Sequence, residues 1–363
     1  MTKVDIAVIG AGAVGLATAL QAAGQPGLTI AVIERNRKYG QEISSRNSEV
    51  IHSGFYYHPE MLKSRLCVRG NQLLYEFCAP RQVSHGKIGK ILVALDQSEA
   101  AQLDRLYDNA QVNDVSVRHL TKKQINEMEP EIAGIAGLYF PDSGTIDAPG
   151  YMQALYYEGR QAGVIYLFGT MIKAAFYTGS DYEIVTGQET IHARQVINCA
   201  GLGAEEIAGL IGIKTKEQGY GIHPCKGEYF KIKRKMAIKH LVYSVPAANS
   251  LGIHLSMDNS GGLRLGPNAF YVDELDYSVD ESHGEEFFRA ASRYIPGLQK
   301  ADLLPDFAGI RPKLQGPGEA MKDFVIKEES ELGYPGWINL IGIESPGLTA
   351  SLAIGEYVAA MLG

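Results

Sequence analysis

The stretch Asp5–Gly15, DIAVIGAGAVG, is an apolar run that leads into three glycines with the spacing GxGxxG. A second apolar run, Thr29–Ile33, ends at Glu34, at roughly the distance of 20 residues that separates the glycines from the ribose-binding acid in dinucleotide-binding units. A glycine turn in some other βα unit is the alternative, but it would leave the position of this acid unexplained. We therefore expect a Rossmann-like domain.

Each residue of this motif has a predicted role in binding a dinucleotide. Gly10 permits the tight turn, Gly12 lets the backbone approach a pyrophosphate, and Gly15 lets the helix pack closely on the strand. The helix N-terminus offers N–H groups and the positive end of a dipole to the phosphates. Glu34 can accept both ribose hydroxyls, and we include the adjacent Arg35 among the candidate cofactor ligands. The motif indicates an adenine dinucleotide without choosing between FAD and NAD.

The run Ser44–Tyr57, SSRNSEVIHSGFYY, makes the prediction more specific. A nicotinamide dehydrogenase normally continues to its next crossover here, whereas this chain inserts hydroxyls, a guanidinium, an imidazole and two phenols. We interpret the run as one wall of a flavin site, with His52, Tyr56 and Tyr57 turned toward substrate. The residues expected to face the cofactor are Ser44, Ser45, Arg46, Asn47 and Ser48.

Two later motifs favour FAD over NAD. In 196–203, VINCAGLG, a strand runs into Ala200 and Gly201, where a second backbone segment could lie close to the dinucleotide, although a plain strand-end turn is the alternative. In 338–349, INLIGIESPGLT, a strand leads into a helix that we expect to reach Leu362, and its N-terminus would stabilise negative charge on a reduced flavin. An ordinary capped helix, with Ser345 as N-cap and Pro346 in the first helical position, is the alternative. The candidate flavin ligands here are Gly342, Ser345, Pro346, Gly347, Leu348 and Thr349.

Composition excludes several other functions. The 363 residues carry a net charge of −7 with no basic cluster, which argues against nucleic acid as a partner. No apolar run approaches the roughly 20 residues that span a bilayer, and no signal peptide is evident. The four cysteines show neither CxxC nor metal-ligand spacing, so we expect no metal site. These features favour a cytoplasmic protein.

The order of predicted elements indicates an α/β fold in which two domains are interleaved. Strands are expected at 88–95 and 165–168, helices at 98–109 and 151–162, and hairpins within 182–198 and 252–265. The resulting architecture is a Rossmann-like FAD-binding domain of glutathione-reductase type, interleaved with a substrate domain made of an antiparallel β-sheet plus helix. We assign 1–86, 145–215 and 306–363 to the FAD-binding domain, and 87–144 and 216–305 to the substrate domain.

Four further side chains are candidates for substrate chemistry. Alternation in a strand from Gly252 places His254 opposite the apolar residues, where it could take the proton of a hydroxyl while hydride leaves the same carbon. His52 competes for this role. Arg311 could hold a substrate carboxylate through two parallel hydrogen bonds, and Lys226 could meet a second carboxylate. A hydrogen-bonded histidine, a surface ion pair and a solvated lysine are the respective alternatives.

Taken together, these segments resemble one family. The Gly10–Gly15 motif with Glu34, the Ser44–Tyr57 run, Gly309-Ile310-Arg311-Pro312 and the segment from Ser345 are similar to those of FAD-dependent L-2-hydroxyglutarate dehydrogenases and oxidases, within the D-amino-acid oxidase and glycine oxidase superfamily. The resemblance runs along nearly the whole chain. It implies non-covalent FAD, oxidation of L-2-hydroxyglutarate to 2-oxoglutarate, and electron transfer to oxygen or a membrane quinone. The mechanism that we expect is hydride transfer from C2 of the L-2-hydroxy acid to flavin N5.

Several alternatives stay open. Glycerol-3-phosphate dehydrogenases carry a related Ser-rich run and a similar Gly-Ile-Arg-Pro motif, and an amino-acid or secondary-amine oxidase would use the same fold. A flavin-binding protein without turnover is the alternative from another class. We would expect a glycine in the dehydrogenases where Glu49 stands, which leaves room for another 2-hydroxy acid as substrate. A peripheral membrane contact also stays open, although no amphipathic basic helix supports it.

Overall fold

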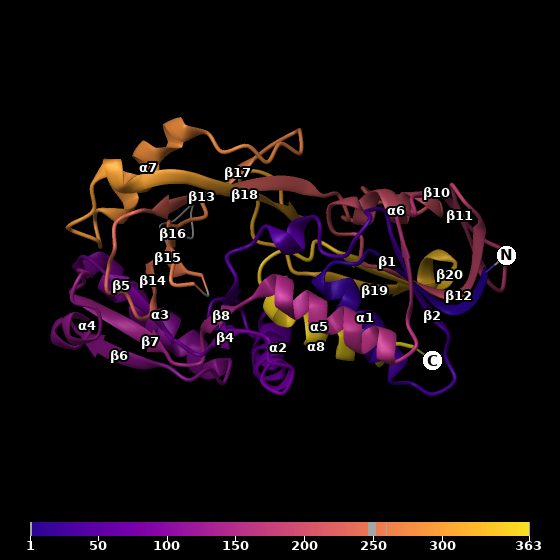
Figure 1. The fold of residues 1–363 in the computed structure, drawn as a ribbon, viewed down its shortest axis with the longest axis horizontal. Helices are drawn as coiled ribbons and strands as arrows, with labels where there is room; N and C mark the ends of the chain where they lie inside the picture. Colours follow the sequence, from indigo (N-terminus) through magenta and orange to yellow (C-terminus); the bar gives the residue numbers. More distant parts are fainter. Residues whose placement is uncertain (1, 246–251, 259, 363) are drawn as a thin grey trace. The chain divides into compact units, whose positions relative to one another are not determined.

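The chain folds into two compact units that interleave along the sequence (Figure 1). The computed structural model describes residues 2–245, 252–258 and 260–362. Unit 1 consists of Met1–Ser45, Ala148–Pro224 and Arg311–Gly363, and unit 2 of Arg46–Asp147 and Cys225–Ile310.

The first exchange between units falls earlier than the domain bounds assigned from the sequence. Residues 46–86, which we had placed with the cofactor domain, belong to unit 2. They do so because β3 (Val50–Ile51) and β4 (His85–Gly86) both pair with β8 (Gly144–Ile146) in a three-stranded sheet of that unit. The Ser44–Tyr57 run therefore contributes its first two residues to unit 1 and the others to unit 2.

Unit 1 is built on a parallel sheet. Its parallel strands lie in the order β20 (Tyr334–Ile341), β12 (Thr190–Asn198), β1 (Thr2–Ile9), β2 (Ile30–Glu34) and β9 (Ile165–Phe168). Three antiparallel strands extend it: β10 (Ile172–Tyr177) and β11 (Tyr182–Thr186) continue from β12, and β19 (Val325–Glu329) pairs with β20. Both faces of the central strands are buried, as the apolar runs in 5–9 and 29–33 predict.

The helices of unit 1 cover this sheet. The helix α1 (Ala13–Ala23) packs against both α5 (Ala148–Gln161) and α8 (Gly347–Ala359) (Figure 1). A short helix, α6 (Ala204–Leu210), follows β12. Single 3₁₀ turns form at Ile43–Ser45, Gly201–Gly203 and Ser330–Leu332.

Unit 2 contains a larger, mostly antiparallel sheet. Its strands lie in the order β17 (Phe270–Tyr271), β13 (His223–Ile232), β16 (Leu263–Leu265), β15 (Leu255–Met257), β14 (Leu241–Ser244), β5 (Lys90–Ala94), β7 (Ala136–Phe140) and β6 (Arg118–Thr121), with β18 (Leu303–Lys313) also paired to β13. Only β14 and β5 run parallel among the pairs for which a register is described. Its helices are α2 (Leu62–Cys78), α3 (Gln97–Val112), α4 (Lys122–Met128) and α7 (Gly284–Ala291), with 3₁₀ turns at Glu281–His283 and Lys300–Asp302.

Two local predictions differ from the structure. The hairpin strand expected from Gly252 begins at Leu255, so His254 lies just before it, two residues after Gly252, whose φ is +83°. Asn259, in the predicted turn of this hairpin, lies outside the described residues. The C-terminal helix begins at Gly347 with Pro346 as its N-cap residue, one position later than the expected cap at Ser345.

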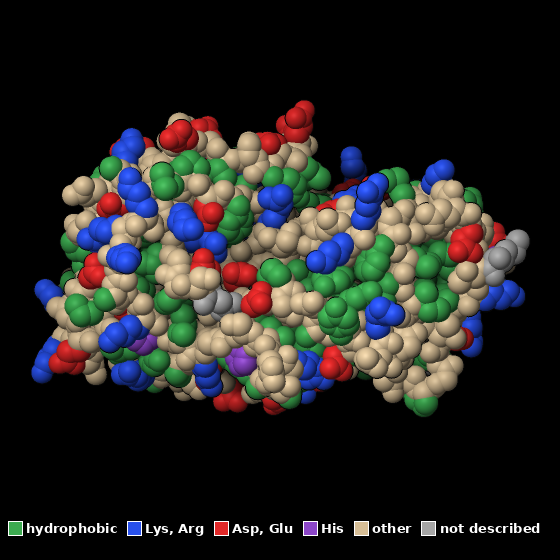
Figure 2. Space-filling view, in the orientation of Figure 1, with side chains coloured by type: hydrophobic (Ala, Val, Ile, Leu, Met, Phe, Trp, Pro, Cys, Tyr) green, Lys and Arg blue, Asp and Glu red, His purple; other side chains and the backbone are tan. Residues whose placement is uncertain are grey.

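The surface carries both signs of charge. On the face drawn in Figure 2, Lys and Arg side chains are interspersed with Asp and Glu. Within 2–245, 252–258 and 260–362, no helix combines the length and apolar character needed to cross a bilayer.

We predict that Gly15→Ala destabilises unit 1. A Cβ at Gly15 would overlap the carbonyl oxygen of Gly10, which belongs to the backbone and cannot rotate away. Overpacking of this kind costs about 3 kcal/mol of unfolding free energy. Urea unfolding should show this loss, whereas Gly209→Ala, with no atom within 4 Å of the added Cβ, should leave stability equal or slightly higher. Equal urea midpoints for Gly15→Ala and the unsubstituted protein would contradict the prediction.

Candidate functional site

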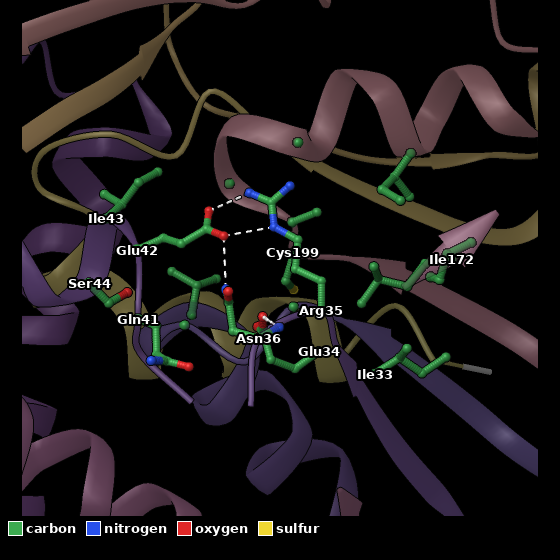
Figure 3. Close-up of a pocket in the computed structure, with 18 of the residues that line it drawn as sticks. Ile33, Glu34, Arg35, Asn36, Gln41, Glu42, Ile43, Ser44, Ile172 and Cys199 are labelled. Carbon is green, nitrogen blue, oxygen red and sulfur yellow. Dashed lines mark hydrogen bonds and ion pairs between the residues drawn. The ribbon is translucent and has the colours of Figure 1, made fainter. Parts of the chain in front are cut away.

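A cavity of about 200 Å³ opens in unit 1 where the parallel strands end (Figure 3). Ile9, Glu34 and Cys199 mark the carboxyl ends of β1, β2 and β12 in its wall. Ligands of doubly wound sheets bind at this edge. Whole small-molecule sites usually enclose about 300–1,000 Å³, so this cavity is large enough for part of a dinucleotide only. Other lining residues include Gly10, Gly12, Arg35, Asn36, Gln41, Glu42, Ile43, Ser44, Met171, Ala200, Gly201, Glu206, Leu340 and Ile343.

The glycine turn fits closely against its neighbours. Gly10 has a φ of +102°, and a Cβ there would lie 2.5 Å from the carbonyl oxygen of Cys199. A Cβ at Gly12 would lie 2.9 Å from the hydroxyl of Ser44. That hydroxyl accepts a hydrogen bond of 3.0 Å from the backbone N–H of Ala13, the first residue of α1. Ser44 therefore lies at the helix terminus where we expected a pyrophosphate to bind.

Glu34 is held by two backbone donors. One carboxylate oxygen accepts from the N–H of Ala11 at 2.8 Å and the other from the N–H of Asn36 at 2.7 Å, and the residue is 8% exposed. A carboxylate oxygen can accept a further hydrogen bond. The geometry thus fits the predicted role, in which Glu34 accepts both ribose hydroxyls.

Arg35 is engaged by an acid that our sequence analysis missed. Its guanidinium donates two parallel hydrogen bonds of 2.7 and 2.6 Å to Glu42, which also accepts from the amide of Asn36 at 2.9 Å (Figure 3). Donating these hydrogen bonds to Glu42 raises the pKa of Arg35. Burial opposes ionisation of Glu42, but the bonds from Arg35 and Asn36 outweigh it and lower the pKa of that carboxyl. The position of Glu42, two residues before the Ser44–Tyr57 run, was the sequence signal that could have identified it.

The other predicted cofactor ligands are distributed differently. Ser45 and the predicted flavin ligands of the C-terminal motif belong to unit 1 but do not line the cavity, although the neighbouring Leu340 and Ile343 do. These ligands are Gly342, Ser345, Pro346, Gly347, Leu348 and Thr349. Arg46 belongs to unit 2, where its guanidinium lies 4.3 Å from the centre of the Tyr277 ring. A Cβ at Gly309 would overlap the carbonyl oxygen of Arg46, which explains the glycine of the Gly-Ile-Arg-Pro motif. The roles of these residues, and of Asn47 and Ser48, remain predictions.

Glu49 adopts a conformation that favours glycine. Its φ is +55°, and its N–H donates a hydrogen bond of 2.8 Å to the side chain of Asn47. Left-handed backbone costs a residue with a Cβ about 1–2 kcal/mol. This local geometry explains why glycine was expected here, and it shows that the turn also forms around glutamate.

The two candidate bases lie near one another in unit 2. His52 follows β3, and its Nδ1 lies 3.5 Å from the ammonium nitrogen of Lys90. His254 stacks on Tyr243 with ring centres 3.6 Å apart, and the Tyr243 ring lies 4.1 Å from the same ammonium. Desolvation, the charge of Lys90 and that of His254 together lower the pKa of His52 well below 6.5. Our sequence analysis did not identify Lys90 and Tyr243 as site residues. For Lys90, the signal that could have identified it is a lysine within an apolar run.

The aromatic pair of the run is fixed by α3. Asn109 donates hydrogen bonds of 2.6 and 3.0 Å to the carbonyls of Phe55 and Tyr57, and Asn113 donates one of 2.9 Å to Tyr57. The rings of Tyr56 and Tyr57 meet edge to face, 5.6 Å apart. Burial raises the pKa of Tyr56, so its hydroxyl keeps its proton at neutral pH. Both phenols therefore remain candidates for orienting a carboxylate.

The two candidate cations have different surroundings. Lys226, 5% exposed, lies 3.1 Å from a carboxylate oxygen of Asp276 and 3.6 Å from one of Glu228. Glu228 also contacts His283 at 2.5 Å. A substrate carboxylate at Lys226 would therefore compete with two protein acids. Arg311 is half-buried in β18, within the part of that strand that belongs to unit 1.

Comparisons with known proteins agree with the cavity and the fold. The FAD dependent oxidoreductase family matches residues 5–361. The mitochondrial L-2-hydroxyglutarate dehydrogenases of Arabidopsis thaliana and Homo sapiens are 34% and 30% identical to this chain, each covering 98% of it and, respectively, 83% and 88% of their own length. The dithionite-reduced L-alpha-glycerophosphate oxidase of Mycoplasma pneumoniae, solved with FAD bound, aligns with a TM-score of 0.88 at 25% identity, over all of this chain and 95% of that one. The predicted resemblance and fold class are confirmed.

We predict that Glu34→Gln weakens FAD binding. The amide offers one oxygen to the two N–H donors of Ala11 and Asn36 and one fewer acceptor to the ribose. Hydrogen bonds to charged groups are worth about 1.5–3 kcal/mol, which corresponds to a rise in Kd of about tenfold to a hundredfold. Titration of the apoprotein with FAD, followed by flavin fluorescence, measures this. Glu217→Gln, on an exposed acid paired with Lys214, is the matched control and should leave Kd unchanged. An unchanged Kd for Glu34→Gln would remove Glu34 from the ribose site.

Proposed function

The chain belongs to the FAD dependent oxidoreductases, an enzyme family with FAD as cofactor, and we propose that its substrate is an L-2-hydroxy acid, most directly L-2-hydroxyglutarate. The proposal is supported by relatives of that name that align with nearly the whole chain. The observation that carries the chemistry is the pair of histidines in unit 2. Because its pKa is held well below 6.5, His52 is neutral at pH 7 and can accept a proton.

The proposed reaction separates a hydride from a proton. Bound FAD would supply the acceptor for a hydride from C2 of the hydroxy acid, through N5 of the flavin. An imidazole of this chain, either His52 or His254, would take the hydroxyl proton. Arg311 would hold one carboxylate in a bidentate geometry that lysine cannot match. Tyr56 and Tyr57 would orient the acid further. Lys226 could contribute only if substrate displaces an acid that it now contacts.

A second candidate is oxidation of glycerol 3-phosphate. It is favoured by the likeness to the Mycoplasma glycerophosphate oxidase. An amine oxidase is distinguished from both by its mechanism, since a neutral amine can lose hydride without a strong base. Anaerobic addition of L-2-hydroxyglutarate, glycerol 3-phosphate and amino acids, with loss of the oxidised flavin spectrum as the readout, separates all three from a flavin protein without turnover.

We also propose oxygen or a quinone as electron acceptor and a reducing compartment such as the cytoplasm. All four cysteines are free thiols, which supports such a compartment. Stopped-flow reoxidation of the reduced enzyme by oxygen and by a short-chain quinone would identify the acceptor.

We predict that His254→Ala slows flavin reduction by L-2-hydroxyglutarate if His254 is the base. The loss should reach about 10²–10⁴-fold with bound FAD retained, because general base catalysis contributes that much. The same measurement on His52→Ala decides between the two histidines. His119→Ala, on an exposed ring stacked against Tyr107, is the control. If the rate of flavin reduction falls less than about tenfold in both His254→Ala and His52→Ala, the hydroxy-acid mechanism is contradicted and amine oxidation is favoured.

A further inference from the structure

Lys90 is a lysine in a place where lysine is rare. It is the first residue of β5 and its side chain is completely buried. Removing an ammonium group from water costs several kcal/mol unless something compensates, so buried lysines usually lie beside carboxylates. The groups that surround Lys90 therefore determine whether its amine is protonated.

The neighbours of Lys90 are bases and aromatic rings. Its nitrogen lies 3.5 Å from Nδ1 of His52, at the long end of hydrogen bonding, and 4.1 and 5.9 Å from the ring centres of Tyr243 and Phe55. Within the described part of the chain, the only ionisable group that favours its charged form is the thiol of Cys67. No carboxylate is recorded within ion-pair distance of it there. Desolvation lowers the pKa of Lys90 to about 7.

The protonation state of Lys90 determines which nitrogen of His52 carries hydrogen. An ammonium donates to Nδ1, which places the hydrogen of a neutral imidazole on Nε2 and removes the lone pair that a base needs. A neutral amine instead accepts from Nδ1–H, which leaves the lone pair on Nε2. Only the second arrangement lets His52 take a proton from substrate.

We propose that Lys90 is a positioning residue that sets the tautomer of His52 and then receives its proton. This inference rests on the proposed function with His52 as the base. In the reaction, hydride leaves C2 for FAD and the hydroxyl proton moves to Nε2 of His52. The Nδ1 proton then passes to the amine of Lys90, which becomes an ammonium, while the imidazole returns to its neutral form. No oxidant beyond FAD is needed.

The proton flows toward Lys90 because it is the more basic member of the pair. Its pKa near 7 exceeds that of His52, which burial, Lys90 and His254 hold well below 6.5. The groups that face this pair are the thiol of Cys67 from α2, the phenol of Tyr243 from β14, and His254. Cys67 keeps its proton at neutral pH, since burial raises its pKa to about 12. Among Lys90, His52 and Cys67, Lys90 is thus the group whose pKa lies nearest 7.

The test measures flavin reduction against pH in three variants of the FAD-loaded enzyme. The rate with L-2-hydroxyglutarate should fall below about pH 7 in the unsubstituted enzyme. In Lys90→Met, His52 alone titrates, so the midpoint should move below pH 6.5, and the rate at pH 8 should drop about tenfold. Lys90→Arg keeps a permanent donor on Nδ1 and should lose activity at every pH. Lys87→Met, on a half-exposed lysine paired with Asp142, should leave the midpoint unchanged.

A second readout needs no substrate. In NMR spectra of the protein labelled with ¹⁵N-histidine, the Nδ1 signal of His52 is the one that disappears in His52→Gln. This signal should change between its protonated and unprotonated forms near pH 7, a change that we call the Nδ1 step. The Nδ1 step should be absent in Lys90→Met. If hydroxy acids never bleach the flavin but the Nδ1 step is present, the proposed function is wrong, whereas the proton exchange between Lys90 and His52 is supported. If bleaching occurs but Lys90→Met changes neither the midpoint nor the Nδ1 step, the inference is overturned.

Discussion

Three backbone segments approach one another closely at the end of β1, and this contact determines the geometry of the candidate cofactor site in unit 1. Gly10 lies against the carbonyl of Cys199 from β12, and Gly15 lies against the carbonyl of Gly10 itself. These contacts leave no volume for a side chain, so α1 starts at one place relative to the parallel strands. Because the helix terminus and the end of β2 are fixed together, Glu34 and Ser44 reach the backbone N–H groups of the glycine turn.

A different constraint, the removal of charge from water, organises unit 2. Three of its lysines, Lys63, Lys90 and Lys226, are almost completely buried, and the surroundings of Lys90 and Lys226 differ. Lys226 lies between the carboxylates of Glu228 and Asp276, whose negative charges offset the cost of burying an ammonium group. Lys90 lies among rings, an imidazole and a thiol, which do not. Carboxylates therefore compensate the burial of Lys226, whereas the surroundings of Lys90 suit a group that gains and loses a proton.

The sequence predicted elements with strong local signals and missed those that depend on distant partners. The glycine motif, the strand at 165–168 and the second hairpin strand at 263–265 appear where periodicity and turn residues placed them. The start of unit 2 at Arg46 could not be predicted, because it depends on pairing between β3 and β8, almost a hundred residues apart. Lys90 lay inside a correctly predicted strand, but nothing local indicated that His52 and Tyr243 would surround it.

The interleaving of the two units also bears on how the chain is made. The edge of β1 pairs with β12, so Thr2 meets Ile191 only after the second segment of unit 1 has been synthesised. At about 5–20 residues per second, a ribosome needs roughly 10–40 s to reach that point. During this interval the apolar strands β1 and β2 can pair with each other but not with their remaining neighbours. Exposed strand edges of this kind can pair with strands of other chains and so lead to aggregation. Production of the enzyme is therefore expected to benefit from chaperones that hold the nascent chain until β9 and β12 have been synthesised.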